Sequence, residues 1–133
     1  MSFLLDTDIC SAHLKQASGA VTSKFLQYAG RLHISVVTLG ELYTWVSRAK
    51  ASPGQLRSLE DFLDELTILD LDARIARRFG QVRAALLDAG RPCPDLDLLI
   101  ASTALAHGLI LVTHNVQDFV NIPGIQIEDW LTT

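Results

Sequence analysis

The chain has 133 residues, of which 49% are hydrophobic and 20% are charged, and its formal net charge at pH 7 is −4. This composition is typical of one globular domain, and no apolar run approaches the roughly 20 residues that a membrane span requires. The negative charge argues weakly against nucleic-acid binding, which usually leaves a basic surface. The charge is uneven, however, because every Lys and Arg lies at or before Arg91.

The first part of the chain alternates short strands with helical segments. An apolar strand is expected over residues 2–5, followed by a helical stretch and by a second helix over about residues 20–29. Residues 32–37 are rich in β-branched side chains and predict a buried strand. Residues 38–41 then have the pattern of a capping box, which predicts a helix from Thr38 to about residue 50.

The middle of the chain carries clear helix signals. Ser52 is a candidate N-cap, with Pro53 at the first helical position and Gln55 three residues after the cap. The apolar stripe of this helix is expected to consist of Leu56, Leu59, Leu63 and Leu66. Residues 67–71 are strand-like. A further strand therefore follows the helix.

A long helix is expected between Asp72 as its cap and Gly90 as its stop. Its inward face is expected to consist of Ile75, Phe79, Val82 and Leu86. The segment 98–106 is apolar nearly all round, which predicts a buried helix that ends at Gly108. Residues 109–112 predict a buried strand.

Strands that alternate with helices predict an α/β fold: a three-layer α/β/α domain over residues 1–133, built on a short, mainly parallel sheet. Ligands of such sheets gather outside the carboxyl ends of the strands. Polar side chains are expected to reach that edge from several segments. They are Asp6, Glu41, Asp95, Asp97, Thr113, Asn115 and Asp118.

Each of these acids also has a simpler explanation as a helix cap. One cap per helix suffices, however, and Asp6 with Asp8, like Asp95 with Asp97, forms a pair. Asp97 directly precedes an apolar run, where a charge is expensive to bury without a counter-ion. Converging carboxylates repel one another unless a cation lies between them. Their hard oxygen atoms suit Mg²⁺ or Mn²⁺, so the sequence predicts a divalent-metal site.

Other chemistries find little support. Cys10 and Cys93 lack the spacing of a metal site, which fits a reduced cytoplasm, although a disulfide between them stays open. The glycines are scattered, so no phosphate-binding loop is expected, and no Gly-x-Ser-x-Gly nucleophile motif is present. His114 lies near the expected site and is a candidate phosphate contact.

Four segments resemble, in order, the motifs of PIN-domain ribonucleases, and in particular of the VapC toxins of type II toxin–antitoxin pairs. They are Leu4–Ile9, Glu41–Leu42, Asp97–Ala101 and Leu111–Phe119. The resemblance covers essentially the whole chain. It implies that Asp6, Glu41 and Asp97 are the metal-binding catalytic acids and that Thr113 supports them. Either Asp118 or Asn115 completes the site.

The resemblance further implies a Mg²⁺- or Mn²⁺-dependent endoribonuclease that leaves a 5′-phosphate. Asp6 and Asp97 would ligate the metal, and Glu41 would ligate it or orient a water molecule. The approach Gly90–Pro92 and the terminal Glu128–Trp130 look like the subgroup that cuts initiator tRNA in its anticodon loop. The cluster Arg74, Arg77 and Arg78, together with Lys50, is a candidate RNA-binding surface.

A toxin of this kind implies a cognate VapB-like antitoxin, and a homodimer is also expected. The antitoxin would send an Arg or Lys among the carboxylates. Apolar candidates for this contact or for the dimer face are Phe25, Tyr43, Trp45 and Leu56.

Two alternatives remain at this stage. One is a non-enzymatic binding module in which the acids hold a structural cation or cap helices. The other is a phosphatase with Asp6 as its nucleophile. The sequence disfavours the phosphatase because no clear lysine follows the late strand to bind the phosphate.

Overall fold

Five short parallel strands form a single sheet in the computed structural model, which describes residues 1–131. The strands are β1 (Phe3–Leu5), β2 (Leu32–Ser35), β3 (Thr67–Leu69), β4 (Ile110–Val112) and β5 (Ile127–Glu128). Their order in the sheet is β3-β2-β1-β4-β5. The chain therefore builds outward from β1 in both directions, and the carboxyl end of β1 lies at a switch point, where ligands of parallel sheets bind.

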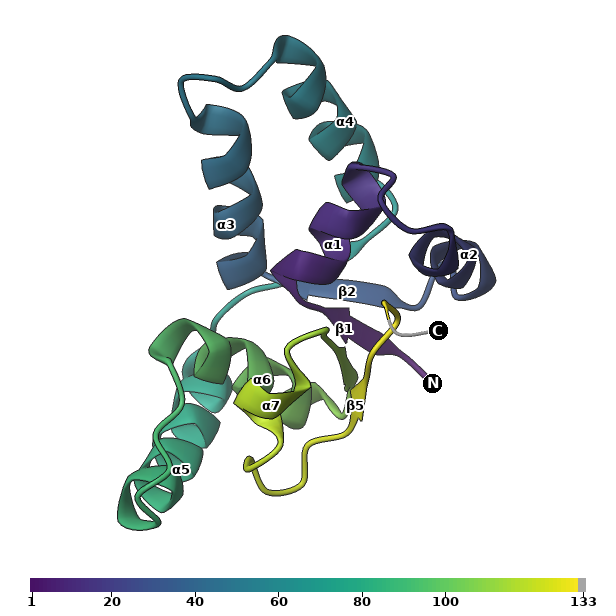
Figure 1. Cartoon of the computed structure of the whole chain (residues 1–133). Helices are drawn as coiled ribbons and strands as arrows, with labels where there is room; N and C mark the ends of the chain where they lie inside the picture. Colours follow the sequence, from purple (N-terminus) through teal and green to yellow (C-terminus); the bar gives the residue numbers. More distant parts are fainter. Residues whose placement is uncertain (132–133) are drawn as a thin grey trace.

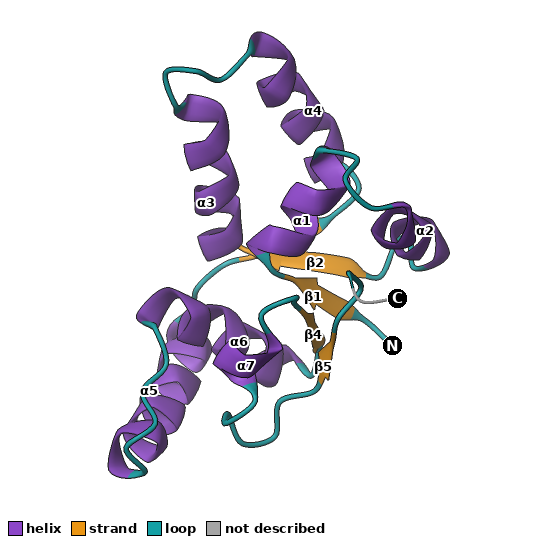
Figure 2. Cartoon of the chain, in the orientation of Figure 1, coloured by secondary structure: helices purple, strands orange, loops and turns teal. Residues whose placement is uncertain are grey.

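Helices cover both faces of the sheet, as Figures 1 and 2 show. They are α1 (Thr7–Leu14), α2 (Gly19–Gln27), α3 (Val36–Ser47), α4 (Pro53–Leu63), α5 (Ala73–Asp88), α6 (Asp95–His107) and α7 (Val116–Phe119). Helices α1 to α4 gather on one side, and α5 to α7 on the other. The expected three-layer α/β/α architecture is thus confirmed.

The central strand β1 supplies both hydrophobic cores. Its three side chains are fully buried, and successive residues of a strand point to opposite faces. Phe3 and Leu5 accordingly pack with helices α1 to α4, whereas Leu4 packs with α5, α6 and α7. Three residues thereby join the two layers of helices to one sheet.

Several expected boundaries are confirmed. Asp72 caps α5 by accepting a hydrogen bond of 3.0 Å from the Ile75 amide. Gly90 and Gly108 follow α5 and α6 with φ of +68° and +65°, a left-handed conformation that favours glycine. At the start of α4, the Ser52 amide donates to the Gln55 side chain over 2.8 Å.

The start of α3 differs from the expectation. Strand β2 ends at Ser35, and the helix begins at Val36 and not at Thr38. The reason is that the Ser35 side chain caps the helix, accepting a hydrogen bond of 3.2 Å from the Thr38 amide. Because this amide is already bonded, Thr38 is inside the helix and the expected capping box with Glu41 does not form.

Three smaller corrections concern faces and ends. Leu56 is 41% exposed, because Phe62 lies beside Leu59 on the buried face of α4. Strand β3 ends at Leu69 and not at residue 71, and α6 begins at Asp95, three residues before the apolar run starts.

Within the described residues, no helix is both long and apolar enough to cross a membrane.

The cap of α3 gives a testable prediction, because α3 carries Glu41. Ser35→Ala should lower the free energy of unfolding by about 1–2 kcal/mol, since it leaves a buried amide without its cap. Thr38→Val is the matched control. The Thr38 hydroxyl is buried and has no hydrogen-bond partner among the described residues, so its loss should cost nothing or stabilise. Urea unfolding of the three proteins measures both effects, and a larger loss for Thr38→Val would contradict this assignment.

Candidate functional site

A cavity of about 210 Å³ lies at the carboxyl end of β1. Seven residues line it: Asp6, Thr7, Asp8, Glu41, Asp97, Ile100 and Asn115. We call it the carboxylate cavity. Its walls come from the start of α1, from α3, from the first turns of α6 and from the loop after β4. Segments that are far apart in the sequence therefore meet at one edge of the sheet, as the sequence predicts.

Asp6 lies at the bottom of this cavity, where the chain leaves β1. Its amide donates to the Val112 carbonyl over 3.0 Å, and its side chain caps α1 by accepting from the Ile9 amide, also over 3.0 Å. Only 6% of the residue is exposed. Burial, reinforced by the charges of Asp8 and Asp97, raises the pKa of Asp6 to about 6, against the lowering effect of hydrogen bonds from Thr113 and Ile9.

Glu41 enters from α3 and is held by α1. The Thr7 hydroxyl donates a short hydrogen bond to Oε1 of Glu41. Thr7 follows Asp6 directly. The end of β1 therefore positions both the Asp6 carboxylate and the hydroxyl that holds Glu41. Sequence analysis missed Thr7, and its only local signal was its place between Asp6 and Asp8.

Asp97 reaches the cavity from the opposite layer, in the first turn of α6. Its pKa is raised by burial first and then by the charges of Asp118, Glu41 and Asp8. A cap role does not explain it, because the N-cap of α6 is Pro94 and no side chain caps this helix. The acid is therefore placed near other acids without a local structural reason.

Asp95 lies outside the carboxylate cavity, although it is only two residues from Asp97 in the sequence. It is exposed, and its carboxylate pairs with the Arg83 guanidinium across 3.5 Å. It lines a different cavity, beside Cys93. Side chains two positions apart on a helix point in directions that differ by about 200° around the helix axis. Asp95 and Asp97 therefore face different cavities. Cys93 and Cys10 are both free, so the disulfide left open by the sequence is absent.

The loop after β4 brings Asn115 to the wall of the carboxylate cavity. Its side-chain amide donates to Oδ2 of Asp8 over 2.6 Å, and its backbone amide donates to the Thr113 hydroxyl over 3.0 Å. Asp118 does not line this cavity but a neighbouring one, from which its charge still raises the pKa of Asp97. Asp8, absent from the predicted set, lies on the wall in its place.

The donor set fits a hydrated divalent cation. Within residues 1–131, no three acidic, histidine or cysteine side chains are close enough together to enclose an ion by themselves. Mg²⁺ does not need such a cage, since one or two carboxylates and several water molecules satisfy it. The charge of Asp97 adds to the cost of ionising Asp6 across this cavity, and a cation between the two carboxylates would lower that cost.

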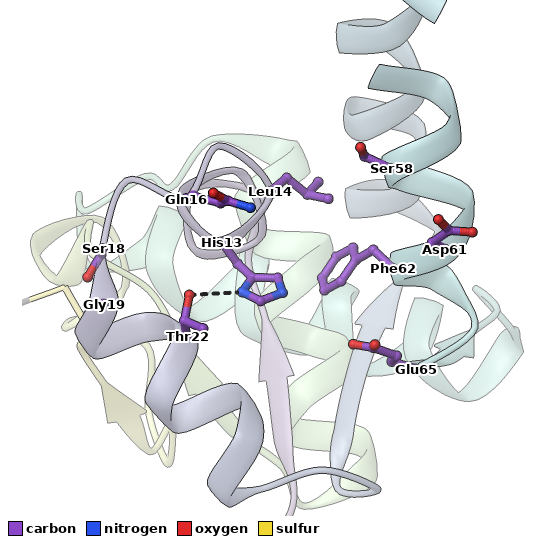
Figure 3. Close-up of a pocket in the computed structure, with 10 residues that line it drawn as sticks. All are labelled: His13, Leu14, Gln16, Ser18, Gly19, Thr22, Ser58, Asp61, Phe62 and Glu65. Atoms are coloured by element: carbon purple, nitrogen blue, oxygen red, sulfur yellow. Dashed lines mark hydrogen bonds between the residues drawn. The ribbon is translucent and has the colours of Figure 1, made fainter. Parts of the chain in front are cut away.

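A larger cavity of about 550 Å³ lies between α1, α2 and α4 (Figure 3). His13 faces it and approaches the Thr22 hydroxyl at 3.4 Å, opposite Asp61 and Phe62 of α4 and Glu65 of the turn that follows α4. We call it the α1–α4 cavity. Seven residues of helix, about 10 Å, separate His13 from Asp6, so this cavity is distinct from the carboxylate cavity.

Comparison with known proteins gives consistent matches. The PIN domain family matches residues 3–125. The tRNA(fMet)-specific endonuclease VapC of Shigella flexneri is 37% identical over 130 residues, which are 98% of each chain. Ribonuclease VapC2 of Haemophilus influenzae is 33% identical over 131 residues, covering 98% of this chain and 99% of the relative.

Solved structures agree with these matches. VapBC2 from Rickettsia felis, bound to a DNA fragment of its promoter, superposes with a TM-score of 0.90 at 32% identity, covering 98% of this chain and 99% of that one. DNA-bound VapBC from Salmonella typhimurium also gives 0.90, at 37% identity and 98% coverage of both chains.

The buried charge of Asp6 predicts an unusual pH dependence of stability. The native state binds this proton more tightly than the unfolded chain, so in chelator the contribution of Asp6 to stability should fall as pH rises from 3.8 to about 6 and stay low above it. Asp6→Asn keeps a good helix cap and removes the charge. It should therefore raise the free energy of unfolding by up to roughly 3 kcal/mol at pH 7.5 and by nothing at pH 3.5. Urea unfolding across this range tests it, and parallel curves for both proteins would refute it.

Proposed function

Since this chain belongs to the PIN-domain family, among the VapC ribonuclease toxins of toxin–antitoxin pairs, we propose that its carboxylate cavity hydrolyses RNA with a bound Mg²⁺ or Mn²⁺ ion. PIN-domain nucleases in general depend on a divalent metal. The observation that carries the site assignment is that acids from α1, α3 and α6 share one cavity, in which the charges of Asp8 and Glu41 help to raise the pKa of Asp97. We propose that the whole chain works as one nuclease domain.

In this proposal, the side chains of the carboxylate cavity have different roles. Asp6 and Asp97 would hold the cation, which would supply Lewis-acid chemistry by acidifying water and stabilising charge on the phosphate. Glu41, fixed by Thr7, accepts the proton of the attacking water molecule. The water oxygen bonds to phosphorus as the bond to the 3′-oxygen breaks. The 3′-oxygen takes up a proton from solvent water and Glu41 returns its proton to solvent, which leaves a 3′-hydroxyl and a 5′-phosphate.

The phosphatase alternative is disfavoured by the surroundings of Asp6. Its carboxylate is almost completely buried and receives hydrogen bonds from Ile9 and Thr113. These contacts orient the carboxylate and leave it poorly placed to attack a phosphorus atom. Holding a cation is the role that they favour.

We propose initiator tRNA, cut in the anticodon loop, as the substrate. The support is the 37% identity, over nearly the whole chain, to a VapC whose name specifies tRNA(fMet). Unpaired loop nucleotides can splay their backbone into a narrow cavity, as the carboxylate cavity requires. Both tRNA and the antitoxin are available in the cytoplasm, which is the location we propose.

Among the basic residues, we propose Arg83 as an RNA contact, because its partner Asp95 lies in the first turn of the helix that also carries Asp97. Arg83 pairs with Asp95 at the start of α6. Arg74, a candidate from the sequence, instead contacts His107 at the end of α6, about 18 Å along that helix from Asp95. Arg74 is therefore poorly placed to hold RNA at the site.

The partner is a VapB-like antitoxin, which accompanies the toxin in the related complexes. We propose that its segment lies in the α1–α4 cavity, where Asp61 and Glu65 favour basic side chains and Phe62 offers an apolar floor. Phe25, a candidate contact from the sequence, is instead buried, stacked between His13 and Phe62.

The nuclease assignment predicts loss of cleavage in two variants. Asp6→Asn and Asp97→Asn should each lower the rate of Mg²⁺-dependent cleavage of initiator tRNA by at least about a hundredfold, since each removes a metal-holding charge. Asp88→Asn, at the exposed end of α5, is the matched control and should cleave normally. The measurement is gel analysis and 5′-end sequencing with and without chelator. Chelator-resistant cleavage, or full activity of either site variant, would contradict the assignment of a metal-dependent nuclease.

The antitoxin surface gives a second prediction. Reversing both charges in Asp61→Lys/Glu65→Lys should weaken binding of the antitoxin about tenfold or more while tRNA cleavage stays intact, because the α1–α4 cavity is separate from the acids. The control is Asp64→Lys/Glu60→Lys. It changes the net charge by the same amount, at one residue of α4 and at its C-cap, but neither residue lines this cavity, so this variant should bind the antitoxin normally. Isothermal titration with the cognate antitoxin measures both, and equal affinities would place the partner elsewhere.

A further inference from the structure

A second cavity, of about 380 Å³, adjoins the carboxylate cavity. Six residues line it: His114, Asn115, Val116, Gln117, Asp118 and Asp129. We call it the β4–β5 cavity, because its walls come from the loop and short helix after β4 and from the end of β5. Asn115 lines both cavities, so whatever occupies the second lies directly beside the proposed point of cleavage.

The walls of the β4–β5 cavity are fixed by hydrogen bonds. Nδ1 of His114 lies 3.1 Å from Oδ2 of Asp129, which joins the loop after β4 to the end of β5. The other oxygen of Asp129 accepts from the Leu131 amide over 2.9 Å. Asn115 is tied to Asp8, and Phe119 anchors α7 in the core with 1% of its surface exposed. The cavity is therefore preorganised for a ligand.

The chemistry of the lining favours a nucleobase over a phosphate. None of the six lining residues is Lys or Arg, and two are acids, so a phosphate would be repelled. Carboxylates accept hydrogen bonds from the exocyclic amino groups of bases, and an amide such as that of Gln117 both donates and accepts. The volume lies within the range of small-ligand pockets. Unpaired bases of RNA loops are read in this way, on their exposed edges.

We propose that the β4–β5 cavity receives the base next to the cleaved phosphate, prefers a base with an exocyclic amino group, and uses Gln117 and His114 as specificity-determining residues. This inference rests on the proposed ribonuclease function, whose site supplies the neighbouring phosphate. Asp118 then acts as an acceptor for the base, which explains why it lies outside the carboxylate cavity. Base selection and bond cleavage are thereby assigned to two adjoining cavities that share Asn115.

The test uses stem–loop RNAs that differ only at the bases flanking the cut. Two pairs of bases are compared at each flanking position: guanine with hypoxanthine, and adenine with unsubstituted purine. Within each pair, the two bases differ only in the exocyclic amino group. Binding is measured by fluorescence anisotropy with Mg²⁺ in a Glu41→Gln background, which keeps both metal-holding aspartates. We expect the amino-bearing base at one flanking position to bind about tenfold more tightly. Gln117→Ala and His114→Ala should reduce that ratio towards one, whereas Gln81→Ala, on the exposed surface of α5, should preserve it.

Cleavage of the same RNAs by the chain without the Glu41 substitution separates the two proposals. A binding preference that depends on Gln117, without cleavage, would support the base site and overturn the nuclease mechanism. Cleavage with equal binding of all RNAs, or with a ratio that Gln117→Ala and His114→Ala leave unchanged, would overturn the base site and retain the nuclease.

Discussion

Carboxylates are brought together in this fold at a place where water screens them poorly. Asp6 is nearly inaccessible, and the charges of Asp8 and Asp97 add to the cost of ionising it. Local hydrogen bonds from Ile9 and Thr113 offset only part of this cost, since the pKa of Asp6 still rises to about 6. Ionising Asp6 at this place is therefore costly, and a bound cation would lower that cost.

The sheet topology makes this concentration of charge possible. Strand β1 is central, and its side chains enter both hydrophobic cores. Asp6 follows β1 directly, Glu41 arrives through α3 on one face, and Asp97 arrives through α6 on the other. The acids consequently belong to different layers, and only the packing of both layers on β1 holds them at one cavity. The hydrogen bond from Thr7 to Glu41 ties α1 to α3 at this point.

Asn115 connects the acids to their surroundings on the other side. Its side chain restrains Asp8, while its backbone amide bonds to the same Thr113 that supports Asp6. A single loop after β4 thus contributes to the carboxylate cavity and to the β4–β5 cavity. The two cavities therefore share one wall at Asn115.

Much of the fold and of the site follows from local features of the sequence. The alternation of strands and helices, the Asp72 cap and the glycine stops depend on residues within about four positions of one another. The acids themselves are visible because each lies at the edge of an apolar run. Tertiary structure alone decided that Leu56 faces outward and that Phe25 is buried. It also separated Asp97 from Asp95 and placed Asn115, not Asp118, at the carboxylate cavity. These outcomes depend on which side of each element meets a distant neighbour, and no local pattern specifies that neighbour.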